Sequence, residues 1–141
     1  MTYLEIAGVV PGLAVSLDGV DPQTGQPLRT TIHCGYVALA KSAAFRGAVR
    51  PDDLQPISFF LPDAPPYAAA PLAVGLELGV RRFRSLPNPG LVIVGPSGER
   101  AELVADPRGG ARQWLQVGFQ LPIYGHQTVE INYRVTVRMA Q

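Results

Sequence analysis

The sequence is poor in the side chains that bind metals or carry nucleophilic catalysis. Its single cysteine, Cys34, cannot form a disulfide within the chain, and its only histidines are His33 and His126. Zinc sites use three or four such ligands. Because His33 and Cys34 are neighbours on a predicted strand, their side chains point to opposite faces. We therefore expect no metal site and no cofactor.

Charge is also scarce. Charged residues make up 16% of the chain, below the usual value of about 25%, and the net charge is +1. This balance gives no electrostatic reason to bind nucleic acid or an anionic membrane. A neutral surface is easier to bury against a protein partner, although a compact β domain with a polar exterior fits the same composition.

Long hydrophobic runs are missing. No stretch of 18 or more apolar residues could form a transmembrane helix, and the first residues lack the basic region of a secretion signal. We therefore expect a cytoplasmic protein, or a virion component assembled in the cytoplasm, with no membrane partner. A chain of 141 residues suits a single domain, 1–141, that buries its own core.

What the sequence does contain is a regular series of short apolar runs separated by its 15 glycines and 14 prolines. Apolar and polar residues alternate without a break over residues 128–139, which predicts a half-buried strand. Residues 12–40 predict two antiparallel strands around a turn at 21–27. Within the second of these, we assign Ile32, Cys34 and Tyr36 to the apolar face, with Cys34 as a buried thiol.

Further strands are predicted at 57–61, 74–80, 91–94, 100–104 and 112–121, with a hairpin turn at 95–98. Residues 39–48 and 64–70 fit either a helical turn or extended chain. The total is about eight to ten strands with little helix. The predicted fold is an all-β antiparallel sandwich or jelly roll.

No catalytic constellation stands out. Cys34 lies on the face assigned to the core, away from any base, and Ser97 follows a proline in a turn rather than in a nucleophile elbow. Asp52 and Asp53 follow Pro51, as residues of a turn or cap do, and a calcium loop needs more oxygen ligands in order. We expect a protein that is not an enzyme.

Trp114 is the most informative single residue. In the predicted strand it shares a face with Arg112 and Gln116, opposite Leu115 and Val117. A tryptophan on a polar face suits a protein interface or a sugar-stacking platform. The alternative is that Trp114 covers the edge of the core.

A basic cluster and a tyrosine complete the candidate residues. Arg82 and Arg84 are expected on one face of a strand, with Arg81 and Phe83 on the other. The arginines could bind phosphate or an acidic protein surface, whereas nucleic acid is disfavoured because such clusters are usually solvated or paired with acids. Tyr124 is a second candidate for stacking on a carbohydrate.

These observations favour a non-catalytic structural or assembly module. Such a module would self-associate as a homo-oligomer or decorate a larger protein particle, for example as a head-decoration or tail component of a phage-type virion. The alternative is a β-sandwich module that binds a carbohydrate or another ligand, with Trp114 and Tyr124 as stacking residues.

Overall fold

Seven antiparallel strands form the described part of the protein. The computed structural model describes residues 2–87, 95–106 and 109–141, and these residues contain strands and turns but no helix. The strands are β1 (Leu4–Val20), β2 (Pro27–Lys41), β3 (Leu54–Phe60), β4 (Ala73–Ser85), β5 (Ser97–Ala105), β6 (Gln113–Pro122) and β7 (His126–Ala140).

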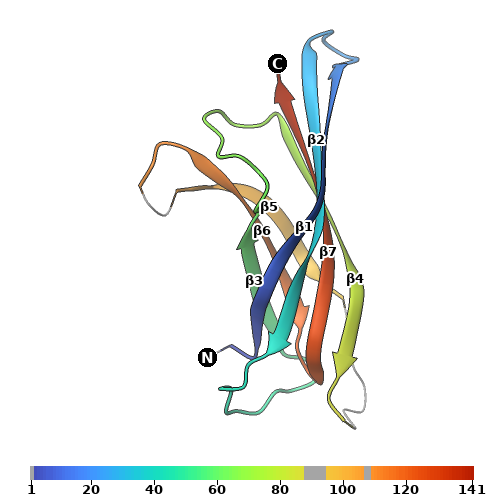
Figure 1. Cartoon of the computed structure of the whole chain (residues 1–141), viewed down its shortest axis with the longest axis vertical. Coiled ribbons are helices and arrows are strands. Elements are labelled where there is room, and N and C mark those ends of the chain that lie inside the picture. The colour runs from blue at the N-terminus through green and yellow to red at the C-terminus, as the bar shows by residue number, and fades with distance from the viewer. Residues whose placement is uncertain (1, 88–94, 107–108) are drawn as a thin grey trace.

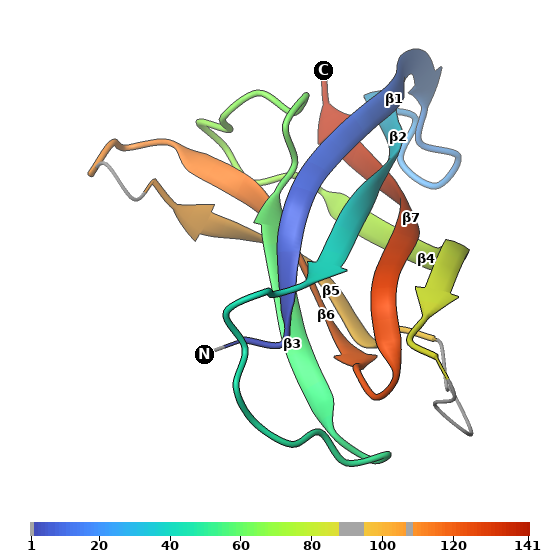
Figure 2. The ribbon, with the colours of Figure 1, turned by 60° about the horizontal axis from the view of Figure 1, so that its bottom comes forward.

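The strands form two sheets (Figures 1 and 2). One sheet has the order β1-β2-β7-β4 and the other has the order β3-β6-β5. The predicted all-β sandwich is confirmed, whereas the jelly-roll topology is not. The predicted strand at 91–94 lies outside the described residues. The predicted strand at 100–104 is part of β5, which begins earlier, at Ser97.

The predicted hairpin at 12–40 is confirmed and is longer than expected. Strands β1 and β2 pair from Leu4 opposite Lys41 to Val20 opposite Pro27. In the connecting loop, Gly25 has a φ of 73°, a left-handed conformation that glycine adopts without strain. Figure 1 shows this hairpin extending past the end of the three-stranded sheet, on the side where the C-terminus lies.

The core lies between β7 and β6, and its pattern follows the sequence closely. On β7 the expected apolar face is buried from Val129 to Val137, and Met139 packs at its edge. On β6, Leu115 and Val117 are buried. Strand β3 adds the face that the sequence predicts: Ile57, Phe59 and, just after it, Leu61.

The predicted burial of β2 is wrong. His33, Val37 and Leu39 face the core, and the set containing Cys34 lies half-buried on the outer face of the sheet. Both faces of β2 carry apolar residues, so alternation alone does not show which face the second sheet covers.

The two ambiguous segments are extended or turn structures. Strand β2 continues to Lys41 and is followed by a turn in which Phe45 donates to the Ser42 carbonyl. In the second segment, Tyr67 forms an isolated bridge with Gln113. The part of the chain that the structure describes holds no helix long and apolar enough to cross a membrane.

Candidate functional site

Toward its turn, the β1–β2 hairpin carries three apolar residues of β1 on the face that no second sheet covers. Leu13 is 58% exposed, Leu17 57% and Val15 37%. Their partners on β2 are the outward-facing Cys34, Thr30 and Ile32. We call Leu13, Val15 and Leu17 the β1 row.

The opposite side of the same strand segment is polar or small. Ala14 and Ser16 pair with His33 and Thr31, are themselves exposed, and the Ser16 and Thr31 hydroxyl oxygens are 3.0 Å apart. A monomeric sandwich normally places apolar residues inside and polar residues outside. This segment of β1 is exposed on both faces and gathers its apolar side chains on the outer one, which is the arrangement expected when a partner contacts that face.

Toward the other edge of the four-stranded sheet, the outer face becomes charged. Arg81 and Arg82 both bind Glu130, with Nε–Oε distances of 3.0 and 2.7 Å. The hydrogen bond from Arg82 is the main cause that lowers the pKa of Glu130. The Arg81 guanidinium also lies 4.5 Å from the centroid of the Tyr36 ring.

The two ion pairs of Glu130, with Arg81 and with Arg82, correct the expected placement of the arginines. A register shift between Val80 and Arg82 inserts Arg81 as an extra residue, so Arg81 reaches the same face as Arg82 rather than the opposite one. Arg84 shares that face, opposite Thr128, and lines a hollow beside Arg82 and Phe83. Two of the three arginines are therefore paired with an acid.

The predicted Trp114 face lies on the other sheet. Trp114 and Gln116 are half-buried on the outer surface of β6, while Leu115 is buried beneath. Trp114 lies opposite Val104 of β5. Arg112 precedes β6 and is exposed. The expected alternation is confirmed.

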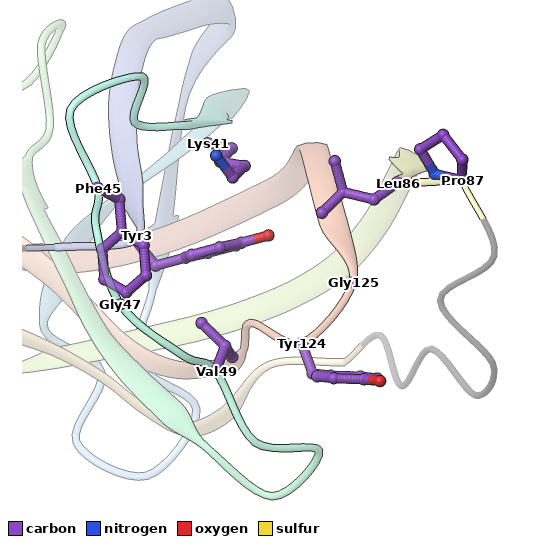
Figure 3. Close-up of a pocket in the computed structure, with 9 residues that line it drawn as sticks. All are labelled: Tyr3, Lys41, Phe45, Gly47, Val49, Leu86, Pro87, Tyr124 and Gly125. Atoms are coloured by element: carbon purple, nitrogen blue, oxygen red, sulfur yellow. The ribbon is translucent and has the colours of Figure 1, made fainter.

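Tyr124 lines a pocket at the opposite end of β6 (Figure 3). The pocket has a volume of about 310 Å³ and includes Tyr3, Phe45 and Lys41 among its walls. The rings of Tyr3 and Phe45 meet edge to face, with centroids 5.2 Å apart. The Tyr3 hydroxyl donates to the backbone carbonyl of His126 at 2.8 Å, and burial raises the pKa of Tyr3.

Lys41 gives this pocket its charge. It is the only lysine of the chain, and its Nζ lies 5.9 Å from the centroid of the Tyr3 ring. The described lining residues include no carboxylate. An aromatic wall beside a single cation suits a ligand with a flat apolar body and one negative charge.

The structure therefore separates the predicted site residues into three places, the first of which holds Arg82 and Arg84 on β4. Trp114, Arg112 and Gln116 lie at one end of β6, and Tyr124 lies beyond its other end. From Trp114 the strand runs on to Pro122, which is roughly 26 Å of extended chain, and Tyr124 lies in the turn that follows. A single ligand the size of a monosaccharide cannot stack on both rings. The β1 row was visible in the sequence as an alternation, but the side it faces was not.

A buried polar group lies between the sheets. The Nδ1 atom of His33 is 3.3 Å from the Oδ1 atom of Asp63, and Tyr133 is buried on the neighbouring strand. Burial, followed by the charges of Asp63 and Cys34, raises the pKa of Tyr133 to about 12.

Within residues 2–87, 95–106 and 109–141, no three His, Cys, Asp or Glu side chains gather where they could hold a metal ion. Comparisons with models of known families, with curated proteins and with solved structures find no match for this chain.

Proposed function

We propose that this protein is a non-catalytic assembly module that self-associates, and that it builds or decorates a larger protein particle such as a phage-type virion. The observation that carries the proposal is the exposed apolar row on the outer face of the β1–β2 hairpin. Leu13 and Leu17 lie in solvent on one face of the strand, and the polar Ser16 and Asp18 are exposed on the other.

The energetic argument is one of area. Burying a leucine side chain is worth about 1.5–3 kcal/mol, so the two exposed leucines of the β1 row favour any contact that covers them. The sheet edge beside them adds hydrogen-bonding groups of β1 that no further strand of its sheet pairs. Together these features supply both an apolar surface and a template for strand pairing.

The test is the native mass by light scattering over a wide concentration range. We expect a discrete oligomer for the wild type and at least about tenfold weaker association for Leu13→Ser/Leu17→Ser, because two buried leucines are lost. The matched control is Leu54→Ser, which removes a leucine that is 54% exposed on the other sheet. A wild type that stays monomeric at every concentration contradicts the proposal.

A second candidate function is binding of a small ligand, and the Tyr3–Lys41–Tyr124 pocket supports it. An acidic sugar combines a face that stacks on tyrosine with a carboxylate that lysine attracts. In a glycan screen we expect Tyr124→Ala and Lys41→Ala to lose binding while Trp114→Ala keeps it. A screen in which no acidic glycan binds the wild type contradicts this candidate.

A further inference from the structure

We infer that two copies of this chain pair through the open edge of β1, antiparallel and centred on Val15, so that their four-stranded sheets join into one sheet of eight strands. This inference rests on the proposed self-association and specifies its geometry. The β1 row of one copy then lies beside the β1 row of the second copy.

One end of the β1 edge already has hydrogen-bond partners, and the rest of the edge is open. At the start of the strand, the side-chain amide of Gln55 binds both the N–H and the C=O of Leu4, at 3.0 and 2.7 Å. Gln55 therefore occupies the place of a neighbouring strand there. No hydrogen bond of this kind covers the edge from Leu13 to Leu17 within the described residues.

The Gln55 contact also sets which backbone groups point outward. Leu4 lies opposite Lys41, and its N–H and C=O point away from β2 because they bind Gln55. In an antiparallel ladder this orientation alternates along the strand. The alternation along β2 gives the same outward direction to the residues opposite His33 and Thr31, which are Ala14 and Ser16.

The sequence around Val15 is symmetric in the way that a two-fold pairing requires. With Val15 opposite its own copy, Leu13 faces Leu17 of the partner subunit and Ala14 faces Ser16 of the partner subunit. Ala14 and Ser16 both direct their backbone groups outward, so each pair can exchange hydrogen bonds. The two β1 rows then lie side by side on the joined outer face.

Charge and edge protection favour this strand over β4. The only charged residues of β1 are Glu5 and Asp18, and in this register Asp18 faces Gly12 of the partner subunit rather than another acid. The devices that normally block strand pairing, Pro11 and the two bulges, lie before Leu13. The β4 edge instead carries Arg81, Arg82 and Arg84, which would repel a second β4.

Disulfide trapping tests the register directly. All variants carry Cys34→Ser, because Cys34 lies opposite Leu13 on the same face. Two Val15 residues would form a non-hydrogen-bonded pair with Cα atoms about 4.5 Å apart, which a disulfide can span. We expect Val15→Cys to form a covalent dimer on mild oxidation. Leu13→Cys should not, because its copies lie four residues out of register.

Mixing two cysteine variants provides the positive control for the expected absence of a Leu13→Cys homodimer. Leu13→Cys mixed with Leu17→Cys should link into a heterodimer, because these positions face each other. If the Cys34→Ser protein is oligomeric but Val15→Cys does not link, the β1 register is wrong while self-association stands. If that protein is monomeric at every concentration, both proposals fail.

Proline substitution gives an independent test of the edge. Ser16→Pro removes an N–H that points away from β2, so the hairpin should fold with unchanged circular dichroism while dimerisation is lost. An exposed hydroxyl contact with Thr31 is all that the variant otherwise gives up. A folded Ser16→Pro protein that still dimerises as tightly as the wild type overturns the inference.

Discussion

The side-chain amide of Gln55 replaces a strand for Leu4: its Oε1 accepts the Leu4 N–H at 3.0 Å, and its Nε2 donates to the Leu4 carbonyl at 2.7 Å. Both residues are buried. Because Gln55 belongs to β3 and Leu4 to β1, this pair ties one sheet to the other. It also marks where the protected part of the β1 edge ends.

Gln55→Ala should destabilise the protein. The variant leaves the N–H and C=O of Leu4 buried without partners, and each such group costs about 1–3 kcal/mol. Urea denaturation measures the loss, with Gln127→Ala at an exposed position near the start of β7 as control. An unchanged midpoint for Gln55→Ala would show that water replaces the amide.

Gly35→Ala should also destabilise the protein, for a steric reason. A methyl group at Gly35 would collide with the Tyr133 hydroxyl and with the carbonyl of Val10. Such overpacking costs about 1–3 kcal/mol. Gly75→Ala is the matched control, because no atom lies within 4 Å of a methyl group placed there. Thermal unfolding that ranks the two variants equally would contradict this reading of the core.

Tyr133 should make the fold sensitive to alkali. Its pKa is raised from 10.0 in the unfolded chain to about 12 in the folded protein, chiefly by burial. The corresponding stability is fully present below pH 10 and is lost as the pH rises through about 12. Denaturation at several alkaline pH values should show this decline in the wild type and a shallower one in Tyr133→Phe.

At neutral pH, Tyr133→Phe should leave stability nearly unchanged, since the buried hydroxyl has no hydrogen-bond partner among the described residues. Tyr36→Phe, on the outer face, controls for the loss of a tyrosine hydroxyl. An alkaline decline that is as steep in Tyr133→Phe as in the wild type would assign the effect to another group.

Glu130 should make the stability of the fold depend on pH at the acid end of the range. Its pKa is lowered below 4.5, first by the hydrogen bond from Arg82. The stability it contributes is present above pH 4.5 and is lost as the pH falls through the lowered value. We expect Glu130→Gln to be less stable than the wild type near neutral pH and to approach it in acid. A stability difference that is constant with pH would contradict this origin.

High salt provides a second check on the ion pairs that Glu130 forms with Arg81 and Arg82. Salt screens partly exposed ion pairs, so the difference between the wild type and Glu130→Gln should shrink as ionic strength rises. Glu77→Gln on the neighbouring part of β4 is the control, because no ion pair of Glu77 is described. A stability difference between the two proteins that does not change with salt would mean that packing, rather than charge, causes it.

The strands that the sequence predicts best are those with only one apolar face. On β7, Val129 to Val137 alternate with threonine, glutamate, asparagine and arginine, so burial has one consistent solution. On β6, the polar glutamines leave Leu115 and Val117 as the inward residues. In both strands local chemistry alone decides the orientation, because side chains alternate with a period of two.

The candidate sites needed more than this local rule. The pocket joins Tyr3, Lys41 and Tyr124, which are far apart in the sequence and meet only when β1, β2 and the β6–β7 turn come together. The position of Arg81 beside Glu130 depends on a bulge in β4, which alternation within a single strand cannot reveal. Both the pocket and the ion pairs of Glu130 can be located only when the pairing register between strands is known.

The sequence by itself determined that this chain is an all-β sandwich, which residues alternate, and that Trp114 lies on a polar face. Only the tertiary structure decided that His33 faces inward, that Cys34 faces outward, and that the β1 row lies in solvent. The physical reason is that alternation follows from the geometry of one strand. Which face becomes buried depends instead on contacts with strands remote in the sequence.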